Sequence, residues 1–101
     1  AAPAAAQAQA WPTRPIEMVI GFPNSSGVGI YARKLADPLS RALGQPVVVN
    51  PRIGAGGNVA SDFVAKARPD GTVILFGTAG THAINQTLYR RLPFNVLNDF
   101  T

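Results

Sequence analysis

The sequence predicts an α/β fold, a three-layer arrangement around a parallel sheet, because apolar runs and helical patterns alternate along it. Three short apolar runs rich in β-branched residues are candidate strands, at residues 16–22, 46–50 and 72–76. A segment with helical spacing of apolar residues separates each run from the next. Crossovers that contain a helix join parallel strands with right-handed geometry, so we expect a βαβαβ order with helices on both faces.

The first run lies between Pro15 and Pro23, which predicts a short buried strand. After a polar turn, apolar residues recur at helical spacing up to Gly44, a residue type that commonly follows the end of a helix. These apolar residues are Ile30, Ala32, Leu35, Leu39, Ala42 and Leu43. Pro38 lies inside this helix and has no backbone N–H, so we predict a kink or a break in its middle.

The second run has Val47, Val48 and Val49 at its centre, a composition typical of a strand buried on both faces of a parallel sheet. A second helix is predicted over residues 58–67, with Asn58 as a candidate cap at its start. Its apolar face would consist of Val59, Phe63, Val64 and Ala67. A turn at residues 69–71 precedes the third run, and a loop of small residues follows it, leading to a short helical turn around residues 82–89.

Length and charge limit the chain to one domain or less and argue against a nucleic-acid partner. The chain has 101 residues, of which 47% are hydrophobic and 14% charged, as expected of a globular protein. Its formal net charge of +4 comes from scattered residues, and no basic run exceeds two residues, unlike a nucleic-acid-binding arm. The positive excess is compatible with an anionic ligand. The absence of Cys excludes disulfides, thiol catalysis and Cys-type zinc sites.

The first ten residues indicate export. They contain only Ala, Pro and Gln and end in Ala8-Gln9-Ala10, which has the small-x-small form of a signal-peptidase site. We therefore expect residues 1–10 to be the remnant of a signal peptide cleaved near Ala10, with an Ala/Pro-rich linker as the alternative. The ordered chain should begin near Trp11, and we expect it to lie in the periplasm. No other apolar stretch approaches the ~20 residues that a membrane span needs.

Three loops rich in Gly, Ser and Thr follow the predicted strands, at residues 23–27, 52–57 and 78–81. In parallel sheets, ligands bind beyond the carboxyl ends of the strands, where the strand order reverses. The first loop leads into a helix N-terminus, whose unpaired amides and positive dipole end favour an anion such as a carboxylate. Spacing alone leaves an ordinary helix start, capped by Ser25 or Ser26, equally open.

Enzyme chemistry has little support in the sequence. The run Gly54-Ala55-Gly56-Gly57 resembles a dinucleotide-binding loop, but Val59 stands where Gly or Ala is needed, and no acidic residue follows the next strand. His82 is the only histidine, without partners for a metal site or a catalytic triad, and a structural or ligand-lining role suits it better. We expect no cofactor and no catalytic residue.

Several segments of residues 11–101 together form a recognisable pattern. They are Trp11-Pro12-Thr13-Arg14-Pro15-Ile16, Phe22-Pro23, Gln45-Pro46-Val47-Val48-Val49, Gly54-Ala55-Gly56-Gly57-Asn58, Pro69-Asp70-Gly71, Gly77-Thr78-Ala79-Gly80-Thr81-His82-Ala83-Ile84-Asn85 and Leu88-Tyr89. With these segments, residues 11–101 resemble the receptor family of the tripartite tricarboxylate transporters, also called Bug receptors. The resemblance implies a two-domain periplasmic binding protein of type II, of the Venus-flytrap kind, which closes around a carboxylated ligand and delivers it to a membrane permease. Residues 11–101 would then form part of the first domain, without the second.

The first loop departs from the family pattern. Members usually carry Phe-Pro-Pro-Gly-Gly-Gly there, whereas this chain has Asn24, Ser25 and Ser26 after Pro23, and we expect the change to affect ligand affinity. The resemblance and the loop positions together predict a carboxylate site, in which amides, hydroxyls and bridging waters hold the ligand. Its residues are Phe22, Pro23, Asn24, Ser25, Ser26, Gly27, Thr78, Ala79, Gly80, Thr81 and His82. The alternatives are a truncated, inactive gene product and a fragment of an α/β nucleotide-binding enzyme.

Overall fold

A computed structural model describes residues 11–100, so the expected cleavage near Ala10 lies outside the described part of the chain. The elements follow in the order β1 (Ile16–Ile20), α2 (Gly27–Leu43), β2 (Val47–Pro51), α3 (Asn58–Ala65), β3 (Val73–Leu75) and α4 (Asn85–Leu88). A 3₁₀ turn, Ala55–Gly57, precedes α3, and a π-helical turn, Gly80–Ile84, precedes α4. The three strands form one sheet in the order β2-β1-β3, and both pairings are parallel. The predicted α/β fold is confirmed.

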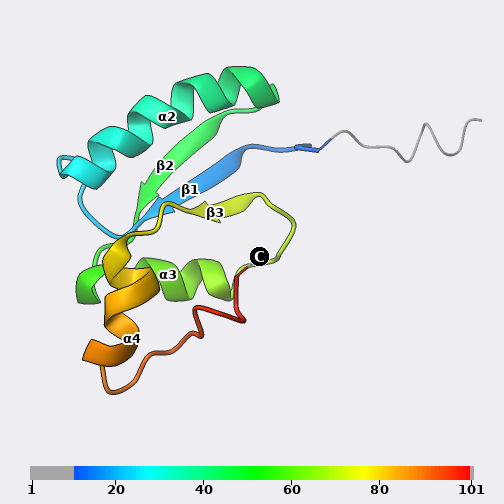
Figure 1. Ribbon diagram of the computed structural model, residues 1–101. Helices are drawn as coiled ribbons and strands as arrows, with labels where there is room; N and C mark the ends of the chain where they lie inside the picture. The colour runs from blue at the N-terminus through cyan, green and yellow to red at the C-terminus, as the bar shows by residue number, and fades with distance from the viewer. Residues whose placement is uncertain (1–10, 101) are drawn as a thin grey trace, which may run out of the picture.

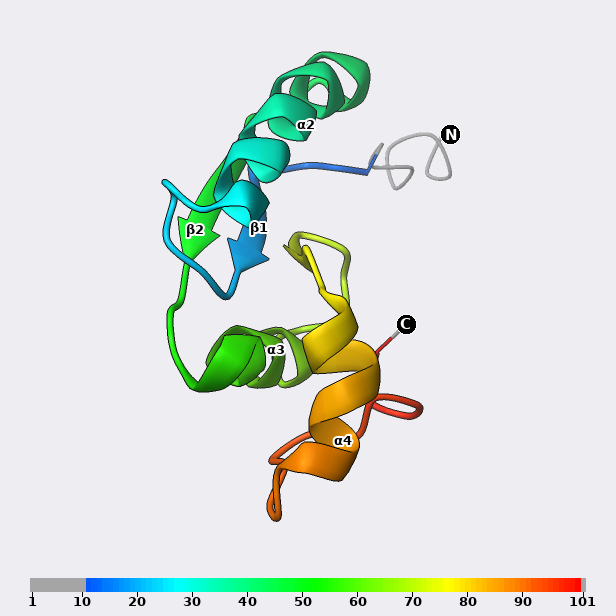
Figure 2. The same cartoon turned by 60° about the vertical axis from the view of Figure 1, so that its left-hand side comes forward.

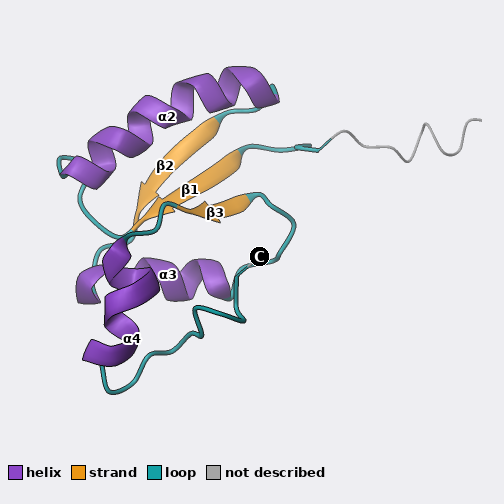
Figure 3. Ribbon diagram, in the orientation of Figure 1, coloured by secondary structure: helices purple, strands orange, loops and turns teal. Residues whose placement is uncertain are grey.

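The two main helices cover opposite faces of this sheet (Figure 1), and the turned view of Figure 2 shows the same separation. The chain moves from β1 outward to β2, and then back past β1 to β3. Because both crossovers are expected to be right-handed, this change of direction sends the first helix to one face and the second to the other. The strand order therefore reverses at β1, and Figure 3 shows all three strands pointing the same way, towards the start of α3.

The core lies around the central strand β1. Met18 and Ile20 alternate onto the face that α2 covers and form a buried cluster with Ala32. Val19 is fully buried between its neighbours. Burying an apolar side chain of this size stabilises a fold by about 1.5 to 3 kcal/mol, so β1 is the main apolar anchor of the sheet.

The prediction that the Val47–Val49 run is buried on both faces is wrong. Within the described residues β2 pairs with β1 alone, and Val48 is 55% exposed. The strand that is buried on both faces is β1, in which four of five residues are buried. β-branched composition favours an extended conformation in either position, so it does not distinguish an edge strand from a central one.

Helix α2 has both of its predicted end signals. Ser26 is its N-cap, with extended backbone (φ −74°, ψ 167°), and its Oγ accepts a hydrogen bond from Gly29 N at 3.2 Å. Gly44 ends it in the left-handed region, at φ 73°. The sequence predicted a kink or a break at Pro38, and the break does not occur, since α2 continues through the proline. Pro38 and Lys34 are exposed, so water can reach the Lys34 carbonyl that the proline leaves without its helical partner.

The predicted cap of the second helix is also wrong. The N-cap of α3 is Gly57, at φ 92°, and it makes no side-chain capping bond. Asn58 is the first helical residue, and its side chain is buried with 4% exposure. The helix ends at Ala65, two residues before the predicted end. In the described part of the chain, no helix is both long and apolar enough to cross a membrane.

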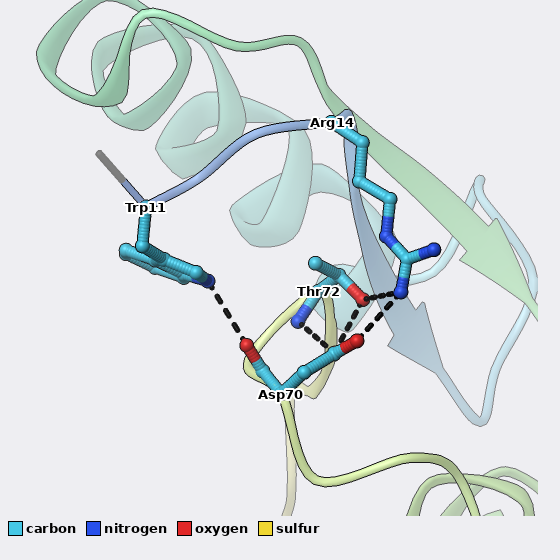
Figure 4. A network of polar contacts seen from close by, with 4 residues as sticks. All are labelled: Trp11, Arg14, Asp70 and Thr72. Atoms are coloured by element: carbon cyan, nitrogen blue, oxygen red, sulfur yellow. Dashed lines mark hydrogen bonds and ion pairs between the residues drawn. The ribbon is translucent and has the colours of Figure 1, made fainter. Parts of the chain in front are cut away.

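A polar clasp ties the segment before β1 to the turn before β3 (Figure 4). The Trp11 indole donates to the Asp70 carbonyl at 3.0 Å, and the Arg14 guanidinium pairs with the Asp70 carboxylate at 2.6 Å. The same carboxylate accepts from the backbone N–H of Thr72 at 3.0 Å and from its hydroxyl at 2.6 Å. Bonds from the Thr72 hydroxyl and amide, with a smaller contribution from Arg14, lower the pKa of Asp70 from 3.8 to about 2.

Candidate functional site

The loops at the carboxyl edge of the sheet meet around Gly57. A Cβ added at Gly57 would lie 2.7 Å from Thr81 Cγ2 and 3.3 Å from Phe22 Cε2, and one added at Gly21 would lie 2.5 Å from Gly57 Cα. Gly57 also has φ 92°, a conformation that residues with side chains rarely adopt. This junction thus combines Phe22, directly before the first loop, with Gly57 of the second loop and Thr81 of the third.

The first loop holds the N-terminus of α2 against the end of β1. Ser26 Oγ donates to the Pro23 carbonyl at 2.5 Å as well as accepting from Gly29, so its hydroxyl serves as the helix cap. The amides of Gly27 and Val28 have no acceptor within the helix, because they belong to its first turn. This loop can therefore offer two backbone donors, together with the positive end of a 17-residue helix, to an anion.

The other predicted residues of the first loop differ in accessibility. Pro23 and Ser25 are exposed, whereas Phe22 and Asn24 are half-buried. The Oδ1 atom of Asn24 is buried without a hydrogen-bond partner in the described part of the protein. Ser25 is exposed and carries a hydroxyl two residues before Gly27, the first residue of α2.

The segment Thr78 to His82 is fixed mainly by its own hydroxyl groups. Thr81 N donates to Thr78 Oγ1 at 3.2 Å, and Thr78 N donates to Thr81 Oγ1 at 3.1 Å, a reciprocal pattern like that of a capping box. The Thr81 hydroxyl also donates to the Thr78 carbonyl, and Thr81 is only 2% exposed. Ala79 is exposed and Gly80 is half-buried at the start of the π-helical turn.

The His82 ring contacts Thr81 on one side and Phe100 on the other. Its Nδ1 lies 2.7 Å from Thr81 Oγ1, and its ring packs against Phe100 with centroids 5.2 Å apart. The ring borders a hollow of about 490 Å³ between α3, β3 and the last residues described, and no residue of the first loop lines that hollow. The structure therefore brings Phe22 and Thr81 close together at Gly57, whereas the His82 ring contacts Thr81 and lines a hollow that the first loop does not reach.

The second loop is folded against protein groups. Arg52 N donates to the Ile20 carbonyl at 2.8 Å, and the Arg52 guanidinium lies over the Phe63 ring, 3.5 Å from its centroid. Gly57 is buried, and Phe22 and Thr81 fill the side of it that a Cβ would occupy. Among residues 11–100, no group of three or more His, Cys, Asp or Glu side chains could hold a metal ion.

Sequence reasoning missed a buried amide pair behind these loops. Asn85 Nδ2 donates to Asn58 Oδ1 at 2.7 Å and to the Gly56 carbonyl at 3.4 Å. Asn58 and Asn85 are 4% and 5% exposed. The available signal was that Asn58 directly follows the Gly54 to Gly57 loop and that Asn85 lies three residues after His82, each near the predicted start of a helical segment.

Comparisons with known proteins identify relatives of this chain. A model of the tripartite tricarboxylate transporter family receptor matches residues 31–101. The chain is 42% identical over 95 residues to a UPF0065 protein of Bordetella bronchiseptica, covering 94% of this chain and 28% of that protein. It thus spans less than a third of this relative's length.

Solved structures give the same result for the fold. MatC of Rhodopseudomonas palustris with bound malate superposes with a TM-score of 0.86 at 33% identity, over 90% of this chain and 31% of that one. R. palustris Rpa4515 with adipate superposes with a TM-score of 0.83 at 37% identity, over 86% of this chain and 29% of that one. The periplasmic binding protein BugD gives 0.84 at 35% identity, over 88% and 29%. The chain belongs to the receptor family of the tripartite tricarboxylate transporters.

Proposed function

We propose that the polypeptide carrying this chain is a periplasmic receptor that binds a small organic acid and delivers it to the membrane permease of a tripartite tricarboxylate transporter. The observation that carries this proposal is the loop junction at the carboxyl edge of the sheet, together with the amides of Gly27 and Val28, which have no acceptor within α2. None of the three loops contains Asp or Glu, so no carboxylate of these loops competes with an anionic ligand. Malate and adipate, bound in two similar structures, are both dicarboxylates and support this ligand class.

One ligand carboxylate would accept from the amides of Gly27 and Val28, with the Ser25 hydroxyl beside them. Residues Phe22 to Gly27 and Thr78 to His82 would form this side of the cleft, with water bridging the donors that do not reach the ligand. The hydroxyls of Ser26 and Thr81 already have protein partners, so their contribution would be to shape the loops. Binding of this kind makes and breaks no covalent bond.

Residues 11–101 would form part of the first of two domains, and residues 1–10 the remnant of an export signal. The ligand would lie between this domain and a second one, which closes over it. This arrangement is supported by the high structural similarity over a third or less of each neighbour's length. The small net positive charge of +4 would also favour encounter with a dianion over a cation.

The test removes one amide donor. Gly27 has open space around it, since a Cβ there would meet no atom within 4 Å, and the extended conformation of the preceding Ser26 is compatible with a following proline. Gly27→Pro removes the N–H while preserving the helix start, and Gly27→Ala is the matched control that keeps the N–H. A lost hydrogen bond to a charged group costs about 1.5 to 3 kcal/mol, so Gly27→Pro should weaken dicarboxylate binding by about ten- to a hundredfold.

Calorimetry on the full product of the gene, with its export signal removed, measures both variants against malate and adipate. Gly27→Ala should bind as the unchanged protein does, and the neutral diamides of the same acids should bind to neither. Equal affinity in Gly27→Pro and Gly27→Ala would move the carboxylate away from the start of α2. Failure of the unchanged protein to bind any di- or tricarboxylate would contradict the proposed function itself.

A further inference from the structure

The buried amide pair Asn58–Asn85 joins two of the loops at the carboxyl edge of the sheet. Asn58 begins α3 directly after the Gly54–Gly57 loop, and Asn85 begins α4 directly after the π-helical turn. The donor and acceptor atoms are 2.7 Å apart, and both residues are at least 95% buried. A buried amide that loses its partner remains desolvated, so such a pair strongly favours the arrangement in which the two loops lie together.

The direction of the hydrogen bond follows from a third group. The same Asn85 amide faces the Gly56 carbonyl at 3.4 Å, and a carbonyl can only accept, so the atom of Asn85 at this point is the donor Nδ2. Asn58 therefore presents its oxygen, Oδ1, to the pair. The roles of the two residues are different: Asn85 must donate, whereas Asn58 needs only to accept.

The pair lies immediately behind the third loop. A Cβ added at Gly80 would lie 3.9 Å from Asn85 Oδ1, 4.0 Å from the Gly56 carbonyl oxygen and 3.5 Å from Thr78 Oγ1. The helix that Asn85 begins has only four residues, too few to hold its own geometry without tertiary contacts. The Thr78 and Thr81 hydroxyls bond within the loop and fix its internal shape. Its position relative to the second loop depends on Gly57, Gly80 and the amide pair.

We propose that Asn58 and Asn85 are positioning residues, which act through the Thr78–His82 segment to set the affinity of the receptor for its ligand. Neither side chain would touch the ligand. The inference rests on the proposed function for its effect on affinity, but the positioning itself also occurs in the ligand-free protein. It predicts that the Thr78–His82 segment stays in place only when the side chain at position 85 donates a hydrogen bond, so that a polar residue without a donor there is not sufficient.

Two isosteric variants with the same charge change separate these roles. Asn58→Asp keeps the acceptor oxygen facing Asn85 Nδ2, and the bond becomes charge-assisted. Asn85→Asp replaces the donor by a carboxylate that faces Asn58 Oδ1 and the Gly56 carbonyl, so three acceptors meet without a proton. Burial and these acceptors raise the pKa of the new carboxyl, and when it is protonated its O–H again donates to Asn58 Oδ1.

The first measurement is amide hydrogen exchange of the ligand-free protein, expressed in full from its gene. Exchange of the amides of Thr78 and Thr81 should be about tenfold or more faster in Asn85→Asp than in Asn58→Asp at neutral pH, and protection should return as the pH falls through the carboxyl pKa. Equal exchange in the two variants, or faster exchange in Asn58→Asp alone, would overturn the proposal. This result does not depend on whether any carboxylate binds.

The second measurement is calorimetry with malate and adipate at neutral and at low pH. At each pH, the affinity of each variant is divided by the affinity of the unchanged protein. Asn85→Asp should bind about tenfold more weakly at neutral pH and recover at low pH, while Asn58→Asp stays within about twofold. A purely structural role would lower the melting temperature of Asn85→Asp and leave the affinity of the folded protein independent of pH. Loss of loop protection with unchanged affinity would therefore overturn the effect on the ligand and leave the proposed receptor function intact.

Discussion

The two ends of the sheet are held together by different kinds of interaction. At the amino end, a clasp of exposed and half-exposed polar groups ties Trp11 and Arg14 to the turn around Asp70. At the carboxyl end, the backbones of Gly21 and Gly57 approach closely, and the buried side chains of Asn58 and Asn85 form a hydrogen bond between two loops. The amino end carries a carboxylate and can respond to pH and salt. The three loops at the carboxyl end contain no Asp or Glu, and the first amides of α2 there have no acceptor within the helix.

This difference suits the proposed function. A protein carboxylate beside the start of α2 would compete with an anionic ligand, and the sequence has none in the three loops. The clasp places its carboxylate, Asp70, at the opposite end of β3 from those loops. The comparison predicts that substitutions at the carboxyl end change stability or affinity strongly, and that substitutions at the amino end change stability weakly and with pH.

Gly57→Ala should have the largest effect on stability. The added Cβ would lie 2.7 Å from Thr81 Cγ2 at a φ of 92°, so overpacking and backbone strain act together and should cost about 2 to 4 kcal/mol. Urea unfolding of the full gene product measures the cost. Gly27→Ala is the matched control, because a Cβ there meets no atom within 4 Å, and it should leave stability unchanged or raise it slightly. Equal stability of the two variants would remove Gly57 from the centre of the junction.

Thr81→Val should have the next largest effect. The change keeps the shape of a side chain that is 2% exposed but removes the hydroxyl that bonds with Thr78, at a cost of about 1 to 3 kcal/mol. Thr81→Ser keeps the hydroxyl and loses only the methyl group that packs beside Gly57. The same unfolding measurement should rank Val as more damaging than Ser. The opposite order would mean that methyl packing, and not the hydroxyl pattern, fixes the loop.

The sequence predicts local features well and long-range ones poorly. Ser26 and Gly44 were predictable helix ends, because capping depends on residues a few positions apart. The alternation of runs was sufficient to predict the parallel α/β fold, which the strand pairing confirms. The edge position of β2 was not predictable, because β-branched residues suit edge and central strands alike.

The same limit applies to the candidate site. Loops at strand ends are visible in the sequence, but the pairing of Asn58 with Asn85 joins residues 27 positions apart. Sequence patterns assigned Asn58 to a cap, since Asn is common there, and burial gave it another partner. The contribution of Trp11 to the clasp likewise spans 59 positions. The assignment of Phe22 to Gly27 and Thr78 to His82 as ligand contacts stays a prediction.

Acid should weaken the amino end. The folded protein lowers the pKa of Asp70 from 3.8 to about 2, so the unfolded chain binds this proton more readily than the folded one. The stabilisation is therefore complete above about pH 4 and is lost as the pH falls towards 2. Urea unfolding against pH should show a steeper loss of stability in this window for the unchanged protein than for Asp70→Asn, which has no proton to gain. Parallel curves would contradict the lowered pKa.

Trp11→Phe should have the smallest effect, because it removes a single exposed hydrogen bond and keeps an aromatic ring over Gly71. The indole N–H donates to the Asp70 carbonyl at 3.0 Å, and Trp11 is 53% exposed, so water can replace the lost donor and the cost should stay below about 1 kcal/mol. A Cβ at Gly71 would lie 3.1 Å from the indole ring, so Trp11→Ala should cost more by losing this packing as well. Urea unfolding at neutral pH compares the two variants, and dicarboxylate affinity should change in neither. Weaker ligand binding in Trp11→Phe would show that the two ends of the sheet are energetically coupled and would contradict their separate roles.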